Sequence, residues 1–446
     1  MGASPPHAAG LAPYNGEPPE GTIVSVDPTL LEDLEWRGLI ASSTDRDALS
    51  AALREGSVRF YVGFDPTAPS LHLGNLVQLV TAKRLQDAGH TPYLLVGGAT
   101  GMIGDPRDSG ERTLNTLETV QEWSDKVRAQ VSALVPFEGD NAATVVNNYD
   151  WASGLSTIDF LRDIGKHFPV NRMLARETVK RRLESGISFT EFSYVLLQSM
   201  DFLELFRRHG VTLQFGGSDQ WGNLTGGVEL IRRADGGHAH AFATPLITKS
   251  DGTKYGKTEG GALWLDPQMM SPYAFHQFWL NVEDEKVGEL LRIFTFLPQA
   301  EIEALEARHA EQPFRREAQK TLADEVTTLV HGADETEQAK AAALALFGTG
   351  DITALSAKTV GAALGEAGAT DVDRTAGIPS VVDLLVATGL VSSKSEARRT
   401  VGEGGAYVNN VRIEDPEHVP GEPDLIGGEW LVVRRGKKRF AGVRVG

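Results

Sequence analysis

The sequence predicts an α/β protein in which a parallel sheet flanked by helices precedes a helical region and a small α+β domain. The apolar runs VRFYVGF and TPYLLVGG enclose a stretch with helical spacing, and strand–helix–strand order with short connections is typical of parallel sheets. Charged stretches with helical spacing fill residues 284–347. Two short helical patterns followed by AYVNNVRI and GEWLVVRRG then indicate a separate small domain.

The elements are expected in a regular order along the chain. Amphipathic helices are predicted at 28–40 and 45–56, a strand at 58–64, a helix to about residue 88 and a second strand at 91–98. Glycine-rich polar turns, GATGMIGDP and QFGGSDQWGN, follow later strands. Ligands in open α/β sheets bind at the carboxyl ends of the strands, so these turns are candidate binding segments.

At 446 residues the chain is long enough for two or three domains. The Pro-, Gly- and Ala-rich start predicts a disordered tail over 1–28. We expect a catalytic α/β domain at 29–247, a lysine-containing loop and helical domain at 248–347, a Gly-, Ala- and Thr-rich linker at 348–378 and the last domain at 379–446.

The composition narrows the classes of function. A formal net charge of −17 argues against a general nucleic-acid binder, because affinity for phosphate backbones comes from Lys and Arg. Basic residues nevertheless cluster at 172–182 and 432–446, although a single basic cluster is more often a solvated face. No cysteine is present, no apolar run approaches the ~18 residues of a membrane helix, and no secretory signal is recognisable. These features predict a cytoplasmic protein.

The stretch DPTAPSLHLGN, residues 65–75, is polar and lies between a strand and a helix. A helix N-terminus offers unpaired N–H groups, Gly74 allows close approach of a ligand, and His72 and Asn75 share one face of the first turn. Phosphate or ribose binding would use these properties. The alternative is an ordinary turn capped by Asp65 and Ser70, and this stretch by itself favours that alternative.

A second stretch, TKSDGTKYGKT at 248–258, carries three lysines and two glycines. It lacks the spacing of the GxxxxGK[ST] phosphate loop. Mobile lysines in such a loop suit a departing pyrophosphate, because they supply point charges that close over it. A solvated surface loop is the alternative.

Together these motifs resemble a known family. HLGN resembles the HIGH motif and KYGKT the KMSKS motif of class I aminoacyl-tRNA synthetases. With YVGFDPTAPSLHLGN, GGATGMIGDP, YVLLQSMDFLEL and QFGGSDQWGN, the chain from about residue 30 onward is similar to the bacterial tyrosyl-tRNA synthetases. The last segment, with SKSEARRTV, is similar to the S4-type RNA-binding domain. The resemblance implies a Rossmann-like catalytic domain, a helical anticodon-binding domain and an S4-like domain.

The resemblance also implies roles for individual residues. Tyr61 and Asp201 would bind the phenol of the substrate tyrosine, and a buried donor and acceptor reject phenylalanine because that substrate leaves them unpaired, a form of discrimination already known from this family. The remaining implied tyrosine contacts are Tyr194, Gln198 and Asp105 for the ammonium and Gln220 for the carboxylate. Tyr194, Gln198 and Asp201 have the spacing of one helical face.

For ATP, the resemblance implies phosphate contacts from Thr67 and His72 and ribose contacts from Asn75 and Asp219. The other implied ATP or loop residues are Gly63, Asp65, Gly74, Arg112, Gly217, Lys254, Lys257 and Thr258. Magnesium would accompany the ATP phosphates. The resemblance implies no prosthetic group for the protein. Asn75 stands where the motif has its last His, and an amide donates a hydrogen bond but carries no ionisable proton.

The implied function is two-step charging of tRNA(Tyr): ATP-dependent formation of tyrosyl-adenylate, then transfer of tyrosine to the terminal ribose. The implied partners are L-tyrosine, ATP, tRNA(Tyr) and a second copy of the chain, with no membrane. The dimer contact would lie after Trp151, where Phe160, Leu161, Phe168 and Met173 mix with basic residues. Two rivals remain: a related nucleotidyl-transferring enzyme such as a tryptophanyl synthetase, and a non-catalytic RNA-binding protein.

Overall fold

The computed structural model describes residues 25–106, 115–253, 255, 257–258, 261–346, 352, 355–366, 368–436 and 439–446. The chain forms two compact units: the first runs to Leu265 and includes Gly288–Gln299, and the second comprises Asp266–Val287 and Ala300–Gly446. Most of the predicted tail, residues 1–24, lies outside the described part. Its last residues are packed, since the Asp27 N–H donates to the Ala88 carbonyl at 3.0 Å.

The first unit contains the predicted parallel sheet. Its six strands lie in the order β1-β6-β5-β2-β3-β4, and every neighbouring pair is parallel except the short edge strand β1. The central strands are buried on both faces, as their apolar runs predict. The strands are β1 (Ser42–Ser43), β2 (Arg59–Phe64), β3 (Thr91–Val96), β4 (Thr144–Asn147), β5 (Leu213–Gly217) and β6 (His240–Thr244).

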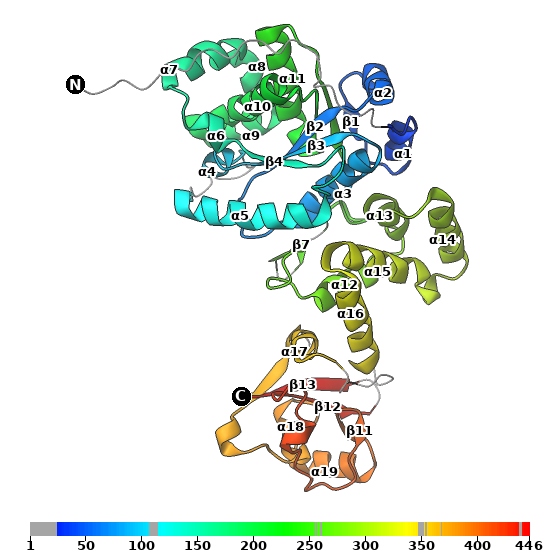
Figure 1. Cartoon of the computed structure of the whole chain (residues 1–446). Helices are drawn as coiled ribbons and strands as arrows, with labels where there is room; N and C mark the ends of the chain where they lie inside the picture. Colours follow the sequence, from blue (N-terminus) through cyan, green and yellow to red (C-terminus); the bar gives the residue numbers. More distant parts are fainter. Residues whose placement is uncertain are drawn as a thin grey trace, which may run out of the picture. The chain divides into compact units, whose positions relative to one another are not determined.

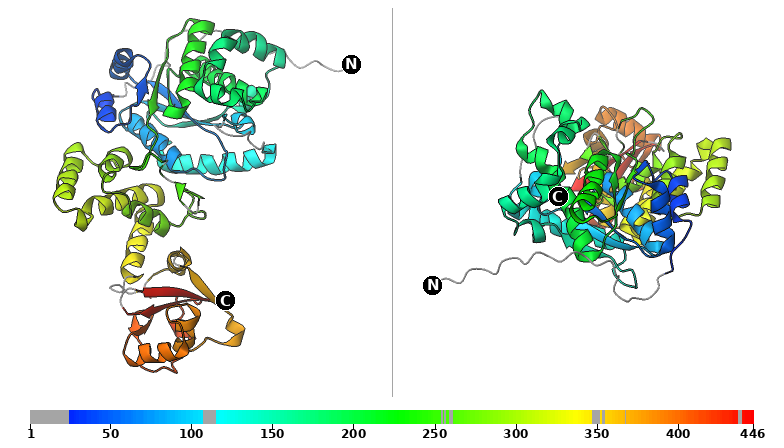
Figure 2. Two further views of the ribbon diagram at one scale, coloured as in Figure 1. Left: turned by 180° about the vertical axis from the view of Figure 1, so that it is seen from behind. Right: turned by 90° about the horizontal axis from the view of Figure 1, so that it is seen from above.

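Helices cover both faces of this sheet (Figures 1 and 2). α3 (Leu73–Asp87) and α5 (Leu117–Leu134) lie on one face, and α10 (Phe189–His209) and α11 (Trp221–Asp235) on the other. The other helices are α1 (Leu30–Trp36), α2 (Arg46–Glu55), α4 (Thr100–Ile103), α6 (Tyr149–Ala152), α7 (Thr157–Asp159), a π-helix (Phe160–Ile164), α8 (Val170–Leu174) and α9 (Glu177–Leu183). Short 3-10 turns occupy Gly165–His167 and Ser218–Gln220.

The boundary predicted between the catalytic and helical domains is wrong in one place. α13 (Val287–Phe294) has helical spacing, as expected, but residues 288–299 belong to the first unit. Two buried arginines of the first unit hold the end of this helix: Arg37 donates to the Arg292 and Leu297 carbonyls, each at 3.0 Å, and Arg84 donates to the Thr295 carbonyl. Such long-range capping cannot be read from local periodicity.

The second unit begins with a group of helices. α12 packs against α15 and α16, and its Trp279 is fully buried. His276 contributes a buried polar contact, with its Nε2 2.7 Å from Asp324 Oδ1. The bounds are α12 (Pro272–Leu280), α14 (Gln299–Glu311), α15 (Glu317–His331) and α16 (Ala333–Leu346), with a 3-10 turn at Pro313–Arg315.

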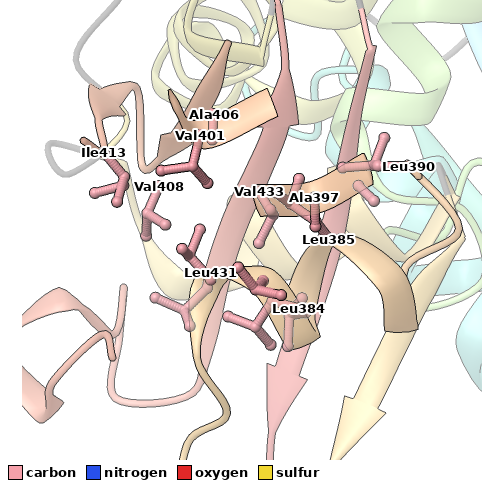
Figure 3. Packing of buried hydrophobic residues seen from close by; sticks show 14 of the residues in the cluster. Leu384, Leu385, Leu390, Ala397, Val401, Ala406, Val408, Ile413, Leu431 and Val433 are labelled. Carbon is pink, nitrogen blue, oxygen red and sulfur yellow. The ribbon is translucent and has the colours of Figure 1, made fainter. Parts of the chain in front are cut away.

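The C-terminal sheet domain, residues 369–446, has five strands in the order β11-β10-β12-β13-β9. α18 and α19 pack on it through an aliphatic core that includes Leu384, Leu385, Ala397, Leu431 and Val433 (Figure 3). The bounds are β9 (Ala369–Val372), α18 (Val381–Ala387), α19 (Lys394–Gly402), β10 (Ala406–Val408), β11 (Val411–Arg412), β12 (Trp430–Arg435) and β13 (Arg439–Val445), with 3-10 turns at Arg374–Ala376 and Glu422–Asp424.

The described residues of the predicted linker at 348–378 are folded into the second unit. This segment contains α17 (Ala357–Glu366) and β9, which pairs in parallel with β13. Val360 and Leu364 of α17 share a core with Ala342 of α16 and Trp430 of β12. The small residues of this segment therefore serve close helix packing, which composition does not distinguish from a linker.

The two predicted basic clusters also differ from expectation. Arg434 is only 2% exposed and donates to the Leu346 carbonyl at 2.7 Å, so it ties the sheet domain to α16. Arg435 pairs with Glu396 at 2.8 Å, and Arg444 pairs with Glu429 at 3.3 Å. In the other cluster Arg182 forms a buried pair with Glu191. These arginines have protein partners, so neither cluster presents all its charges on one solvated face.

Candidate active site

The polar turn after β2 is a capped helix start, and the residues that cap it differ from those expected. His72 is the N-cap of α3: the Gly74 N–H donates to its Nδ1 at 3.1 Å, and the His72 N–H donates to Asn75 Oδ1 at 3.0 Å. Since Nδ1 accepts, the proton of the neutral ring lies on Nε2. The motif residues thus cap the helix, and the His72 imidazole is exposed. Asp65 and Ser70, the caps considered from sequence, do not fill that position.

The segment after the lysine loop is joined to this turn. Leu73 N–H donates to the Leu263 carbonyl at 3.0 Å, and Leu265 N–H donates to the Leu71 carbonyl at 2.9 Å. His72 and Trp264 are directly opposite in this bridge, with ring centroids 6.3 Å apart. The fold therefore holds the segment that follows the lysine loop against the start of α3. Lys254 lies outside the described residues, and Lys257 and Thr258 are described only as backbone in β7 (Lys257–Thr258), which pairs with β8 (Gly261–Ala262).

The residues predicted to bind the phenol lie in the buried centre of the unit. Tyr61 is 1% exposed and Asp201 3% exposed. Asp201 accepts from Asn148 Nδ2 at 3.0 Å and from Trp151 Nε1 at 2.8 Å, and burial raises its pKa to about 7. The Tyr61 hydroxyl is buried with no hydrogen-bond partner among the described residues. Burial and the nearby Asp201 carboxylate raise the pKa of Tyr61 further above its usual range, so it is neutral at physiological pH.

Asp65, assigned to ATP by resemblance, is bonded to the tyrosine-side residues. The Tyr194 hydroxyl donates to its Oδ2 and the Thr100 hydroxyl to its Oδ1, each at 2.6 Å. Asn148 Nδ2 also donates to Thr100 at 2.9 Å, so one amide links Asp65 to Asp201. A side chain at Gly97 would collide with Asp65, because its Cβ would fall 1.9 Å from the carboxylate oxygen. The glycine of GGATG is thus required by this close approach.

A second network joins the GDP turn to the start of α11. Gln220 Nε2 donates to Asp105 Oδ2 at 2.8 Å, and Asn223 Nδ2 donates to Gln220 Oε1 at 2.8 Å and to Asp105 Oδ1 at 3.3 Å. Arg176 Nη2 donates to Asn223 Oδ1 at 2.8 Å. Burial raises the pKa of Asp105, against the opposing effect of its hydrogen bonds. Asp105 and Gln220, assigned to opposite ends of the amino acid, therefore contact each other directly.

The remaining predicted residues lie at the edges of this site. Thr67 and Gly63 are exposed at the end of β2, and the Thr67 N–H donates to the Asp65 carbonyl at 2.8 Å. Gly217 ends β5, and the exposed Asp219 follows it so closely that a Cβ at Gly217 would lie 2.5 Å from its carboxylate. The side-chain Oε1 of Gln198 is buried and has no hydrogen-bond partner among the described residues. Arg112 lies outside the described part of the chain.

Sequence reasoning missed the residues that hold the predicted ones. These are Thr100, Asn148, Trp151, Arg176 and Asn223. Thr100 and Asn223 stand inside the quoted motifs GGATG and SDQWGN, so motif membership was a usable signal for them. Asn148 and Trp151 follow β4 in an unremarkable stretch, and only the fold brings them to Asp201.

The comparisons with known proteins agree with this geometry. Residues 53–348 match the family model described as tRNA synthetases class I (W and Y). Residues 365–443 match the model described as tyrosine--tRNA ligase SYY-like C-terminal domain. The chain is 59% identical over 419 residues to the tyrosine--tRNA ligase of Streptomyces avermitilis, which covers 93% of this chain and 99% of that protein.

Two further proteins show the breadth of the likeness. The tyrosine--tRNA ligase of Corynebacterium glutamicum is 54% identical over 421 residues, or 93% of this chain and 99% of that protein. The crystal structure of a C-terminally truncated Aspergillus nidulans mitochondrial tyrosyl-tRNA synthetase matches with a TM-score of 0.63 and 33% identity, over 70% of this chain and 92% of that one. The fold, the site and these likenesses together place the chain in the family of class I tyrosine--tRNA ligases.

Proposed function

We propose that Tyr61 and Asp201 recognise the phenol in the reaction of this family, in which tyrosine is activated by ATP and then joined to tRNA. The observation that carries this proposal is the unpaired, buried Tyr61 hydroxyl near the Asp201 carboxylate. A buried polar atom without a partner costs about 1–3 kcal/mol, and a phenol hydroxyl would remove that cost by accepting from Tyr61 and donating to Asp201.

At the other end of tyrosine, the ammonium would bind the carboxylate of Asp105 with Tyr194 and Gln198. In the free protein, Gln220 donates to Asp105 at 2.8 Å. An ammonium arriving at Asp105 would take over this acceptor, and the Gln220 amide would then be released to donate to the substrate carboxylate. Asp105 and Gln220 thereby satisfy each other's hydrogen-bonding groups until the substrate provides a partner for each of them.

ATP would lie against the N-terminus of α3 as its magnesium complex. The backbone N–H groups there and the Nε2 donor of His72 suit phosphate oxygens, while Asp219 and Asn75 suit the ribose. The tyrosine carboxylate attacks the α-phosphorus in line, and the bond to the bridging oxygen breaks. Pyrophosphate leaves while Lys254 and Lys257 compensate its charge and the Thr67 hydroxyl donates a hydrogen bond to it. No side chain forms a covalent bond, so positioning and charge stabilisation carry the rate.

In the second step the terminal ribose hydroxyl of tRNA attacks the tyrosyl carbonyl, and AMP leaves. Binding of the tRNA is assigned to the second unit, including the C-terminal sheet domain. We place the reaction in the cytoplasm, where its substrates are found. Among the described residues, no helix has both the length and the apolar character needed to cross a bilayer.

The proposal is tested by tyrosine-dependent exchange between ATP and labelled pyrophosphate. Exchange with tyrosine and little exchange with tryptophan or phenylalanine is the expected pattern. A preference for tryptophan would show that the phenol assignment is wrong. Absence of exchange with all three amino acids, in protein that still binds tRNA, would support a non-catalytic RNA-binding role.

We also propose a homodimer built on the segment after Trp151. Of the residues singled out from sequence, Met173 is buried within the protomer and Phe160 and Phe168 pack partly against its core. Leu161 is exposed, and further apolar side chains join it on this segment: Ile158, Val170, Leu174, Leu183 and Phe189. Such exposure favours a subunit contact. Light scattering at micromolar concentration should give a mass twice that of the protomer. Ile158→Asp should shift this measured mass toward that of one protomer.

A further inference from the structure

Arg176 and Arg172 belong to the same basic segment, but their environments differ. Arg172 is 69% exposed and makes only a loose ion pair with Glu229, at 3.7 Å. Arg176, at the N-cap of the next helix, α9, is half-buried and donates to Asn223 Oδ1 at 2.8 Å. A solvated arginine such as Arg172 suits long-range attraction of a polyanion. A half-buried arginine bonded to a buried amide, such as Arg176, has a structural partner instead.

The amide of Asn223 has only one useful orientation in this network. Its oxygen accepts from Arg176, so its nitrogen faces Gln220 Oε1 and Asp105 Oδ1. Gln220 in turn must then present its nitrogen to Asp105. Rotation of the Asn223 amide by 180° would place a nitrogen against the guanidinium and an oxygen against the carboxylate, and both contacts would be repulsive.

The backbone of α11 is shaped to receive the guanidinium. A Cβ on Gly222 would lie 2.4 Å from Arg176 Nη2 and 3.0 Å from its Nε. Gly222 lies in the first turn of the helix, where alanine is sterically compatible with the backbone and increases helix propensity. The missing side chain at this position therefore provides space for Arg176.

We infer that Arg176 is a positioning residue for the tyrosine ammonium and carboxylate site: through Asn223 it fixes the amide orientations that present Asp105 and Gln220 to the substrate. This inference rests on the proposed roles of Asp105 and Gln220. Arg176 does not itself touch the substrate, and its charge serves the amino-acid site rather than tRNA.

The test uses pyrophosphate exchange by the full chain without tRNA. Arg176→Met should raise the KM for tyrosine about 5- to 20-fold, the order expected when a buried acceptor loses a charged donor, with the KM for ATP unchanged. Arg176→Lys keeps one donor and should recover most of the loss. Arg172→Met removes the same charge from the same segment and should leave the KM for tyrosine at the wild-type value.

Gly222→Ala approaches the same contact from the other side. The added methyl displaces the guanidinium but favours the helix, so the melting temperature should hold or rise while the KM for tyrosine increases as in Arg176→Met. Reduced stability with an unchanged KM in both variants would overturn the inference. If Arg176→Met and Arg172→Met both raised the KM for tRNA in the charging reaction and left the KM for tyrosine unchanged, Arg176 would be an RNA contact instead.

Asp105→Asn separates this inference from the proposed function. If Asp105→Asn leaves the KM for tyrosine unchanged, the assigned ammonium site is wrong. If it raises that KM while Arg176→Met does not, the site stands and the positioning role fails. Because Arg176 acts on Asp105 through Asn223, the effect of Arg176→Met should also shrink in the Asp105→Asn background, and full additivity would count against the coupling.

Discussion

The proposed tyrosine site and the C-terminal sheet domain differ in how their buried polar groups are paired. In the sheet domain the buried Thr400, Asn409 and Arg434 are all hydrogen-bonded to the chain. Among its described residues, no buried side-chain polar atom lacks a partner. The tyrosine site instead leaves the Tyr61 hydroxyl and Gln198 Oε1 unpaired inside the protein. Other buried atoms of the described chain also lack a partner, but these two lie among the residues assigned to tyrosine, so a bound substrate would supply the partners that the chain does not.

The same contrast predicts how each region responds to mutation. Loss of a side chain that pairs with other buried groups of the proposed tyrosine site, as Asp201 does, should be severe, because it leaves those groups without a partner. In the sheet domain the surface charges are exposed pairs, such as Arg398 with Glu417 at 3.4 Å, and single changes should have small effects.

Asp201→Ala should give the largest effect. It removes the acceptor for the substrate phenol and leaves the Asn148 and Trp151 donors unpaired, so kcat/KM for tyrosine should fall about 1000-fold or more. Pyrophosphate exchange measures this value. Asp383→Ala, which removes a paired carboxylate of the sheet domain, is the matched control and should leave exchange near wild type. Comparable losses in both variants would erase the contrast between the two regions.

Lys257→Ala comes next in expected size. Its position after KYG predicts a contact with pyrophosphate that strengthens in the transition state, so kcat for adenylate formation should fall about 100-fold with little change in the KM for tyrosine. Single-turnover kinetics separate the two quantities. An unchanged kcat would remove Lys257 from the mechanism and leave the lysine loop as a solvated surface loop.

Removal of the C-terminal sheet domain should separate the two steps of the reaction. A cut at Gly377 would leave α17 and β9 without the sheet they pack on, so the better boundary follows Leu346 at the end of α16. This shortened chain should keep tyrosine-dependent exchange, while kcat/KM for tRNA falls about 10- to 100-fold and charging by the full chain weakens as salt rises. Undiminished charging by the shortened chain would show that the domain is not needed for tRNA.

Tyr61→Phe should have a smaller effect that is confined to specificity. The ring is retained in the core and only the hydroxyl is lost, so the preference for tyrosine over phenylalanine should narrow about 5-fold. The ratio of the two kcat/KM values in the exchange assay reports this change. An unaltered ratio would mean that the unpaired hydroxyl faces something other than the substrate phenol.

The last prediction concerns the free energy of unfolding rather than activity. Burial raises the pKa of Asp201 from 3.8 to about 7 in the folded protein, so the folded state binds a proton more tightly than the unfolded state does. Its contribution to stability is therefore lost as pH rises from about 4 to about 7, by up to about 4 kcal/mol. Denaturant unfolding without tyrosine measures the free energy of unfolding. Relative to the wild type, this free energy should rise for Asp201→Asn as pH rises from about 4 to about 7. A difference between the two proteins that does not change with pH would exclude the raised pKa of Asp201.

Much of the first unit could be predicted from the sequence because its signals are local. The apolar runs of β2 and β3 and the helical spacing of α3 depend on neighbours within a few residues. The spacing of Tyr194, Gln198 and Asp201 likewise placed them on one helix, and all three lie in α10. Their roles came from the resemblance of the motifs rather than from spacing.

Other features were settled only by tertiary contacts. Asp65 bonds to Tyr194, 129 positions away, and Arg176 to Asn223, 47 positions away, and no local pattern encodes such pairs. The segment 348–378 has the composition of a linker, yet α17 packs into a core shared with α16 and β12. Arg434 has the charge of an RNA contact, yet it caps α16. Composition gives the charged and polar side chains that a segment contains. Burial and pairing decide whether such a side chain contacts solvent, substrate or another part of the chain. That decision depends on distances that only the folded chain defines.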